Sequence, residues 1–284
     1  MILVNIALLG RIFLLGYEKI VVKKLSNGVR SESSAFLYFF IAAVSLIPTL
    51  VFVSDTIHLK LFIPLIISSI VYGVAYLFYI KALSSGEASL IAPLYNLSLL
   101  FLLLLTTIFL GEKLSLAKMG GILLLLYGAS LLGEGENLIV SMKNLTQNKA
   151  SLYMVIASFF IASGRVIDGY AVGGVNPLIY AFGINLGISM FFLIYILSAK
   201  SMKKTIALFK ERPKIAILSG TINSYSYLLL VFAFTHIDVS IAEPASMLST
   251  VVTVILAHFI FGENIGKRLI PAIIMVCGVW LLFL

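Results

Sequence analysis

Charged residues are scarce in this chain. Only 11% of its 284 residues are Asp, Glu, Lys or Arg, whereas soluble domains carry about 25%. Hydrophobic residues make up 61% of the chain, and the mean hydropathy is +1.12. This small number of charged residues could not cover the surface of a soluble domain. The composition therefore predicts a membrane protein.

Cysteine and histidine are also rare, which limits the chemistry to be expected. The single cysteine, Cys277, allows no internal disulfide, and the three scattered histidines have no metal-ligand spacing. The sequence has no Gly-rich phosphate loop, nucleophile elbow or zinc-protease motif. We therefore expect no metal, no cofactor and no catalytic residues, and hence no enzyme.

The net charge of +8 is the next feature to explain. In a soluble protein it would suggest a nucleic-acid partner, but the enrichment of Lys and Arg in cytoplasmic loops accounts for it better. The first apolar run begins at Ile2 without a basic region before it, contains Arg11 and precedes no small-residue cleavage site. We expect this run to be a retained spanning helix rather than a signal peptide.

Ten apolar runs are long enough to cross a membrane, which takes about 20 mostly apolar residues. The expected spans are 2–22, 33–53, 61–83, 88–110, 116–132, 151–171, 177–198, 213–234, 239–261 and 269–284. The sequence therefore predicts an all-α integral membrane protein with ten transmembrane helices.

The two halves of the chain repeat one pattern at an offset of 151 residues. The informative matches are Pro93 with Pro244, Tyr76 with Tyr227, and Gly111-Glu112 with Gly262-Glu263. We expect a five-helix repeat at 1–133, a connecting loop at 134–150 and a second repeat at 151–284. Because five is odd, the second repeat is expected to be inverted, and this plan places a binding site near the membrane midplane.

Ten helices in five-plus-five repeats, with Pro93 and Pro244 early in the fourth and ninth helices and Gly-Glu after both, resemble the EamA-type branch of the drug/metabolite transporter superfamily. The resemblance covers essentially the whole chain. It departs from the family in the first helix, where tryptophan is frequent, because the only tryptophan here is Trp280. The resemblance implies ATP-independent movement of amino acids, other small metabolites or drugs by alternating access.

Charges inside the apolar runs are the first candidates for a site, since each costs about 2.5–3.5 kcal/mol at the centre of a membrane helix. Arg11 and Glu18 lie two turns apart on one face of the first helix. They could form a structural clamp or face a cavity.

Arg165 and Asp168 are adjacent on one face of the sixth helix. They could form a self-neutralising pair, or Asp168 could hold Arg165 ready for the anionic group of a substrate. Arg11 and Arg165 lie in corresponding helices of the two repeats. If both faced inward, two positive centres would favour a substrate that bears an anionic group.

Glu243 immediately precedes Pro244, where the first repeat has Ala92 before Pro93. Proline bends a helix and frees a backbone carbonyl, which is tolerated where the helix lines a cavity. Glu243 could therefore take up a proton or bind a substrate amine. We expect coupling residues at Glu243 and Asp168.

Several uncharged polar residues complete the predicted site. Tyr76 and Tyr227 are repeat-matched and could supply aromatic walls with hydroxyl groups, and Asn96 is a further candidate for substrate binding. Asn185 is better explained as a helix-packing residue, because Gly183 and Gly187 flank it. Glu112 and Glu263 are expected to cap the start of the helix that follows each of them.

We expect a secondary transporter in the cell membrane for a small polar or amphiphilic metabolite, such as an amino acid, an organic anion or a drug-like compound. Its partners would be that substrate, the lipid bilayer, and a proton or a counter-substrate. The alternative within membranes is a translocator of lipids or lipid-linked substrates, and a more distant one is a membrane scaffold or enzyme.

Fifteen Lys and Arg residues fall in odd-numbered connections between the ten expected spans, and three fall in even-numbered ones. This bias predicts outward-facing termini, although the resemblance implies cytoplasmic ones.

Overall fold

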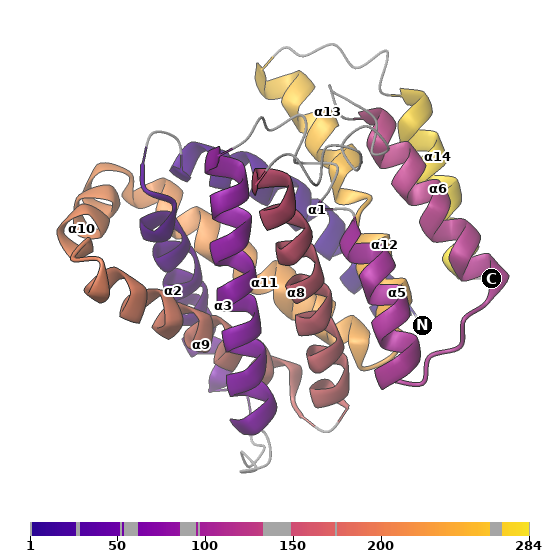
Figure 1. Ribbon diagram of the computed structural model, residues 1–284, viewed down its shortest axis with the longest axis horizontal. Coiled ribbons are helices and arrows are strands. Elements are labelled where there is room, and N and C mark those ends of the chain that lie inside the picture. Colours follow the sequence, from indigo (N-terminus) through magenta and orange to yellow (C-terminus); the bar gives the residue numbers. More distant parts are fainter. Residues whose placement is uncertain are drawn as a thin grey trace. The chain divides into compact units, whose positions relative to one another are not determined.

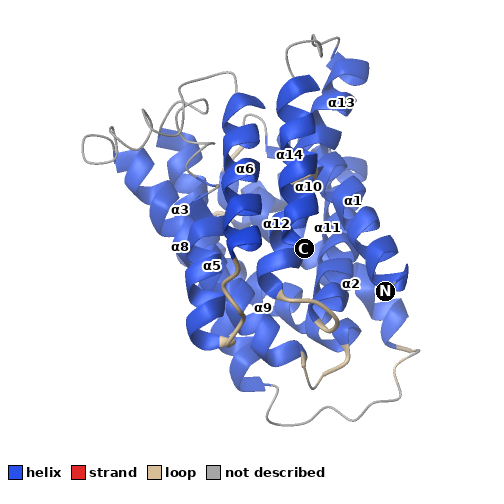
Figure 2. Cartoon of the chain, turned by 90° about the vertical axis from the view of Figure 1, so that its right-hand side faces the viewer, coloured by secondary structure: helices blue, strands red, loops and turns tan. Residues whose placement is uncertain are grey.

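The computed structural model describes residues 2–26, 29–51, 53, 62–85, 95, 97–132, 149–173, 175–261 and 269–283. Every regular element in these residues is an α-helix, and none of them is a strand (Figure 2). Five described helices are long and apolar enough to cross a membrane, and three more apolar helices are shorter. The all-α class predicted from the sequence is confirmed.

The described chain forms two compact units, each built from two separate stretches of sequence. The first unit contains residues 1–73 and 167–236, and the second contains 74–166 and 237–284. Helices α3 (Phe62–Ser85) and α8 (Lys149–Val172) contribute residues to both. Each unit thus takes helices from both predicted repeats, while the repeat boundaries themselves stay a prediction.

In the first unit, helix α11 (Pro213–Phe234) packs against α1 (Ile2–Ser26), α2 (Ser31–Leu50) and α9 (Pro177–Ser198). Small and polar residues let it approach its neighbours closely, as is common between membrane helices. A Cβ added at Gly220 would lie 2.6 Å from the Cβ of Ile41 on α2, so only glycine fits at this crossing. Asn223 donates a hydrogen bond to Asn185 on α9 at 3.1 Å. This bond makes Asn185 a packing residue, as expected.

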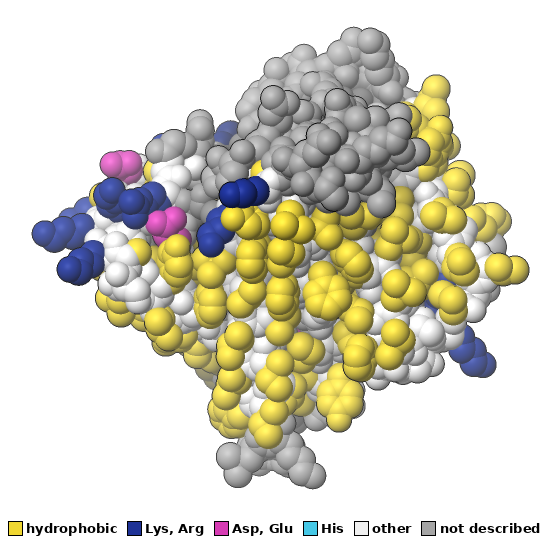
Figure 3. Space-filling model, in the orientation of Figure 1, with side chains coloured by type: hydrophobic (Ala, Val, Ile, Leu, Met, Phe, Trp, Pro, Cys, Tyr) yellow, Lys and Arg dark blue, Asp and Glu magenta, His cyan; other side chains and the backbone are white. Residues whose placement is uncertain are grey.

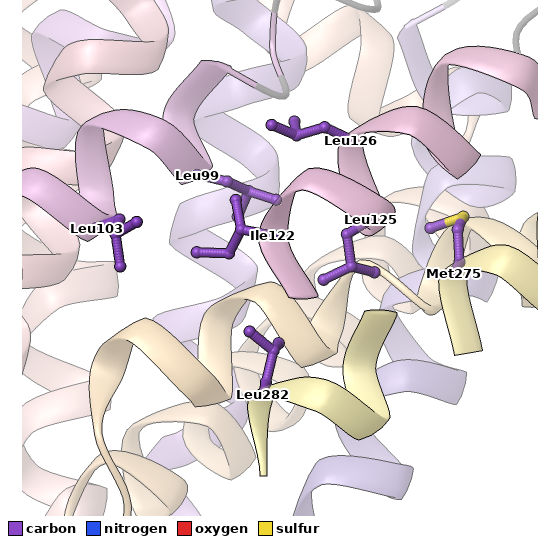
Figure 4. Close-up of a cluster of buried hydrophobic side chains, with 7 residues drawn as sticks. All are labelled: Leu99, Leu103, Ile122, Leu125, Leu126, Met275 and Leu282. Atoms are coloured by element: carbon purple, nitrogen blue, oxygen red, sulfur yellow. The ribbon is translucent and has the colours of Figure 1, made fainter. Parts of the chain in front are cut away.

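In the second unit, α6 (Leu116–Leu132) packs along α14 (Leu269–Leu282). The two helices meet at Gly121 and Gly278, where a Cβ on either glycine would lie within 2.8 Å of the carbonyl oxygen of the other. Leucines of α5 (Leu97–Phe109) join α6 and α14 in an apolar cluster beside this crossing (Figure 4).

The expected span 239–261 is interrupted in the structure. Helix α12 (Val239–Ser246) ends shortly after Pro244, and α13 (Ser249–Phe261) begins after Met247 and Leu248. Proline cannot donate a helix hydrogen bond, and its ring disturbs the preceding turn. The break lies after Pro244 rather than in the turn that proline disturbs, and Glu243 lies in the short helix before the break.

One described helix was not expected. Helix α10 (Met202–Glu211) occupies a segment that the sequence analysis treated as a basic connection, and it packs against α2 and α11 (Figure 1). Each of the ten expected spans contains at least one described helix, so α10 is additional to them.

Candidate functional site

The second unit contains a buried ion pair between two helices. Arg165 extends from α8 and Glu243 from α12, and the Nε atom of Arg165 lies 3.1 Å from Oε1 of Glu243. Both residues are only 8% exposed. Spacing along the helix predicted a pair of Arg165 with Asp168, whereas the structure pairs the guanidinium of Arg165 with a carboxylate that is distant in sequence.

One oxygen of Glu243 differs from the other in its surroundings. Among the described residues, Oε2 of Glu243 has no hydrogen-bond donor, although it is buried. An unpaired charged oxygen at such a position is costly, because neither water nor protein replaces its hydration. The position calls for a further donor, such as a proton or a bound amine.

Three tyrosines lie in the same unit. Tyr76 and Tyr79 of α3 make an edge-to-face contact with ring centroids 6.2 Å apart, and Tyr79 makes a second one with Tyr95 at 5.8 Å. Tyr95 lies within Coulombic range of both Arg165 and Glu243. The predicted residue Tyr76 thus belongs to an aromatic cluster that extends to the surroundings of the ion pair.

Helix α8 connects this cluster to the ion pair. Ser158 of α8 donates a hydrogen bond to the carbonyl oxygen of Tyr95 at 3.3 Å. Ser158 and Arg165 are seven residues apart and therefore lie on one face of the helix. Tyr95 was not singled out from the sequence, although it stands in the polar group Tyr95-Asn96 within an apolar run. Asn96 itself lies outside the described residues.

Asp168 has a different environment, in the first unit. Its side chain is fully buried and accepts four hydrogen bonds from hydroxyl groups. The donors are Ser68 at 2.8 Å and Tyr180 at 2.8 Å to Oδ1, and Tyr72 at 2.6 Å and Tyr227 at 2.7 Å to Oδ2. Four donors at one carboxylate replace its hydration shell and join α3, α8, α9 and α11. Ser68 and Tyr180 were missed in the sequence, since a hydroxyl within an apolar run has no distinctive spacing.

The charges of α1 also find partners within the first unit. Arg11 donates a hydrogen bond from Nη1 to Oγ of Ser226 on α11 at 2.6 Å. Glu18 accepts a short hydrogen bond from the hydroxyl of Tyr38 on α2. The structure therefore uses both charges to attach α1 to its neighbours, and it places Arg11 and Arg165 in different units.

The N-terminus of α12 is held by a side chain from another part of the second unit. Glu112 accepts hydrogen bonds from the backbone N–H groups of Val239 at 2.8 Å and Ser240 at 3.1 Å. Lys118 donates to Asp238 at 2.5 Å and to Ser240 at 3.1 Å. The expected cap on the helix that follows Glu112 is wrong, because Glu112 caps the start of α12, which is distant in sequence. Glu263 lies outside the described residues.

Comparison with known proteins identifies the family of this chain. The sequence model of the EamA-like transporter family matches residues 2–133 and 148–284. A Sinorhizobium sp. protein described as an uncharacterized transporter in the cobO 3′ region is 38% identical over 68 residues, which are 24% of this chain and 48% of that protein. The match thus spans about half the length of that relative.

A solved structure described only as the crystal structure of a protein has a TM-score of 0.73 and 16% sequence identity. The likeness covers 98% of this chain and 96% of the other. At this identity, the likeness is evidence for the fold alone.

Proposed function

This chain belongs to the EamA-like transporter family. We propose that it is a secondary transporter in the cell membrane that moves a small polar or amphiphilic metabolite by alternating access, and that Arg165 and Glu243 form the centre of its substrate and coupling site. The observation that carries this proposal is their buried ion pair, in which one oxygen of Glu243 has no hydrogen-bond donor among the described residues.

The chemistry of this ion pair would allow Arg165 to exchange Glu243 for an anionic group of the substrate. Arginine presents several N–H donors in a planar arrangement that matches a carboxylate or phosphate. Glu243 can release Arg165 by taking up a proton, or Glu243 can bind the amine of a substrate. Arg165 is then available to an anionic group, so the substrate expected here carries one.

The surroundings of the pair favour binding as well. Breaks in membrane helices commonly provide binding sites in transporters, and Glu243 lies just before the break between α12 and α13. Tyr76, Tyr79 and Tyr95 offer aromatic surface with hydroxyl groups, which is the usual lining of a small-molecule pocket.

The test begins with a ligand. Purified protein is screened for thermal stabilisation by amino acids, organic acids and nucleosides, and the best ligand is then used for counterflow in proteoliposomes. Arg165→Ala is expected to reduce counterflow at least tenfold, because the anionic group loses its partner. Arg30→Ala is the matched control, since Arg30 is 51% exposed and forms its ion pair with Glu32 at the surface. Normal counterflow by Arg165→Ala would contradict the proposal.

A second variant separates folding from transport. Removing one partner of a buried ion pair commonly costs about 3–5 kcal/mol, whereas replacing both by apolar residues is often tolerated. Arg165→Met/Glu243→Leu is therefore expected to remain folded and monodisperse and to have lost counterflow. A folded double variant that still transports would overturn the assignment. Stabilisation only by lipid-linked compounds would favour the translocator alternative.

A further inference from the structure

Helix α10 carries three different faces. Ser201, Thr205 and Leu208 are buried, whereas Lys203, Lys204 and Lys210 are exposed. A third face presents apolar side chains, because Ile206 is 50% exposed and Phe209 is 38% exposed. At 3.6 residues per turn, Lys203 and Lys210 lie about 40–60° from Ile206 around the helix, whereas Lys204 lies about 100° further round, beside the buried residues.

The buried face attaches α10 firmly to the first unit. Leu208 belongs to an apolar cluster with Leu25, Leu37 and Ala216. The hydroxyl of Thr205 donates a hydrogen bond to Ser33 on α2 at 2.8 Å. Arg212, which follows α10, donates to the carbonyl oxygens of residues 24 and 25 at the end of α1. The orientation of the other two faces is therefore fixed by packing.

Further lysines flank α10 in the sequence. Lys200 precedes α10 and Lys214 follows it, and both are exposed. The only acidic residue of α10 is Glu211 at its end. Figure 3 shows Lys and Arg side chains gathered over α10, beside a surface on which hydrophobic side chains predominate. On α3 in the same unit, Ile63, Ile66 and Ile70 are exposed, as expected of a face in contact with lipid.

We propose that α10 is an interfacial helix that binds the headgroups of anionic phospholipids. An exposed apolar face beside a basic face is the arrangement by which such helices lie in the membrane interface. Ile206 and Phe209 enter the boundary of the hydrocarbon region, and Lys203, Lys204 and Lys210 reach the phosphate groups. Lysine suits this position because its apolar stem follows the membrane surface while its ammonium group contacts the headgroups.

Charge complementarity selects the lipid. A zwitterionic headgroup offers a basic face no net attraction, whereas an anionic leaflet attracts each lysine near it. The attraction is screened by salt, with a Debye length of about 8 Å at physiological ionic strength. Binding is therefore expected to depend on both headgroup charge and salt.

Thermal stabilisation of the whole chain in detergent measures this binding. Short-chain phosphatidylglycerol is expected to raise the midpoint of unfolding by several degrees more than short-chain phosphatidylcholine at low salt. Lys203→Gln/Lys204→Gln/Lys210→Gln is expected to lose at least half of this difference. Lys81→Gln/Lys113→Gln/Lys149→Gln removes the same charge from exposed positions of the second unit and is expected to keep it.

Three outcomes would overturn the proposal. The α10 variant could keep the full phosphatidylglycerol effect, or both triple variants could lose it equally, which would indicate attraction by net charge alone. Inorganic phosphate could also reproduce the effect at millimolar concentration, which would identify a soluble anion as the ligand.

A fluorescence measurement tests the apolar face without removing any lysine. Phe209→Trp in a Trp280→Phe background places the only tryptophan on α10. Brominated phosphatidylglycerol in nanodiscs is expected to quench it about twofold more strongly than brominated phosphatidylcholine. Tryptophan that is quenched by neither lipid would show that this face does not enter the membrane, and would point to an acidic protein as its partner.

Discussion

At the scale of single residues, two buried carboxylates of this protein have opposite environments. Asp168 accepts four hydroxyl hydrogen bonds, which together occupy both of its oxygens. Glu243 faces one arginine and keeps an oxygen that no described residue bonds. The carboxylate of Asp168 thus connects helices. Of the two predicted coupling residues, we therefore propose Glu243 for the coupling role.

Glu243→Gln is expected to remove the pH dependence of transport. If Glu243 exchanges a proton in the proposed cycle, the rate of transport by the wild type should depend on pH. Glutamine cannot exchange a proton, so transport by the variant should depend on pH much less. The measurement is counterflow or uptake in proteoliposomes at matched internal and external pH.

Glu32→Gln provides the control, because Glu32 forms its ion pair with Arg30 at the surface. It should keep the wild-type profile. An unchanged pH profile in Glu243→Gln would exclude Glu243 from the coupling role.

The sequence was sufficient to find these residues but not to pair them. Arg165, Asp168 and Glu243 were selected because charges in apolar runs are costly and therefore few. Spacing along one helix favoured a pair of Arg165 with Asp168. The actual partner of Arg165 lies on a helix from another part of the chain, and only tertiary packing brings the two together.

At the scale of elements, the start of α12 depends on the turn that follows α5. Asp238 occupies the N-cap position of α12, but its side chain makes no capping hydrogen bond. Glu112 supplies both acceptors instead, and the residue before it, Gly111, has a φ of +67° that favours glycine. The Gly-Glu motif thus fixes the beginning of the helix that carries Glu243.

Glu112→Ala is expected to lower the free energy of unfolding by about 1–2 kcal/mol, as is typical when a helix loses its N-cap. The two N–H groups of Val239 and Ser240 would lose their acceptor, and Lys118 would lose a neighbouring negative charge. Thermal or denaturant unfolding of the detergent-solubilised protein measures the loss. Glu211→Ala, at the exposed end of α10, should change stability by less than about 0.5 kcal/mol. Equal stability of the two variants would contradict the capping role.

Hydropathy predicted the long elements better than the short ones. Every expected span contains a described helix, because about 20 apolar residues are a strong signal. Helix α10 was missed because its lysines lower the average hydropathy of the segment. The helical spacing of its buried residues Thr205 and Leu208 is too short a pattern to predict a helix against that average. The break after Pro244 depends on how the chain around it packs, and a hydropathy average over the run could not show it.

At the scale of the whole molecule, the repeat in sequence and the compact units in space divide the chain differently. The repeat at an offset of 151 residues compares the first half of the chain with the second. The compact units each combine the two halves, with residues 1–73 joined to 167–236 and 74–166 joined to 237–284. Sequence similarity identifies which segments are alike, but it contains no information on which helices pack together. Membership of the EamA-like family, in contrast, followed from the motifs and is confirmed.

The distribution of charge makes an independent prediction about orientation. Of the basic residues in connections between the expected spans, fifteen fall in odd-numbered connections and three in even-numbered ones. Lys118, which is counted in an even-numbered connection, is buried and bonded to Asp238, whereas the lysines of α10, which are counted in an odd-numbered one, are exposed. Since Lys and Arg are enriched in cytoplasmic loops, α10 is expected to be cytoplasmic and the end of α14 to face outward. This arrangement is opposite to the one that the family resemblance implies.

Cysteine accessibility in intact cells tests this orientation. Cys277 is exposed, so the variants are made in a Cys277→Ala background. Ala207 on α10 and Leu114 after α5 are both exposed, so a cysteine at either position should be open to labelling. Leu114→Cys should react with a membrane-impermeant maleimide from outside, and Ala207→Cys should react only after the cells are permeabilised. A reporter fused after α14 should be active outside the cytoplasm. If Ala207→Cys were labelled from outside and the reporter were active in the cytoplasm, the charge bias would have given the wrong orientation and the lysines of α10 would face the outer leaflet.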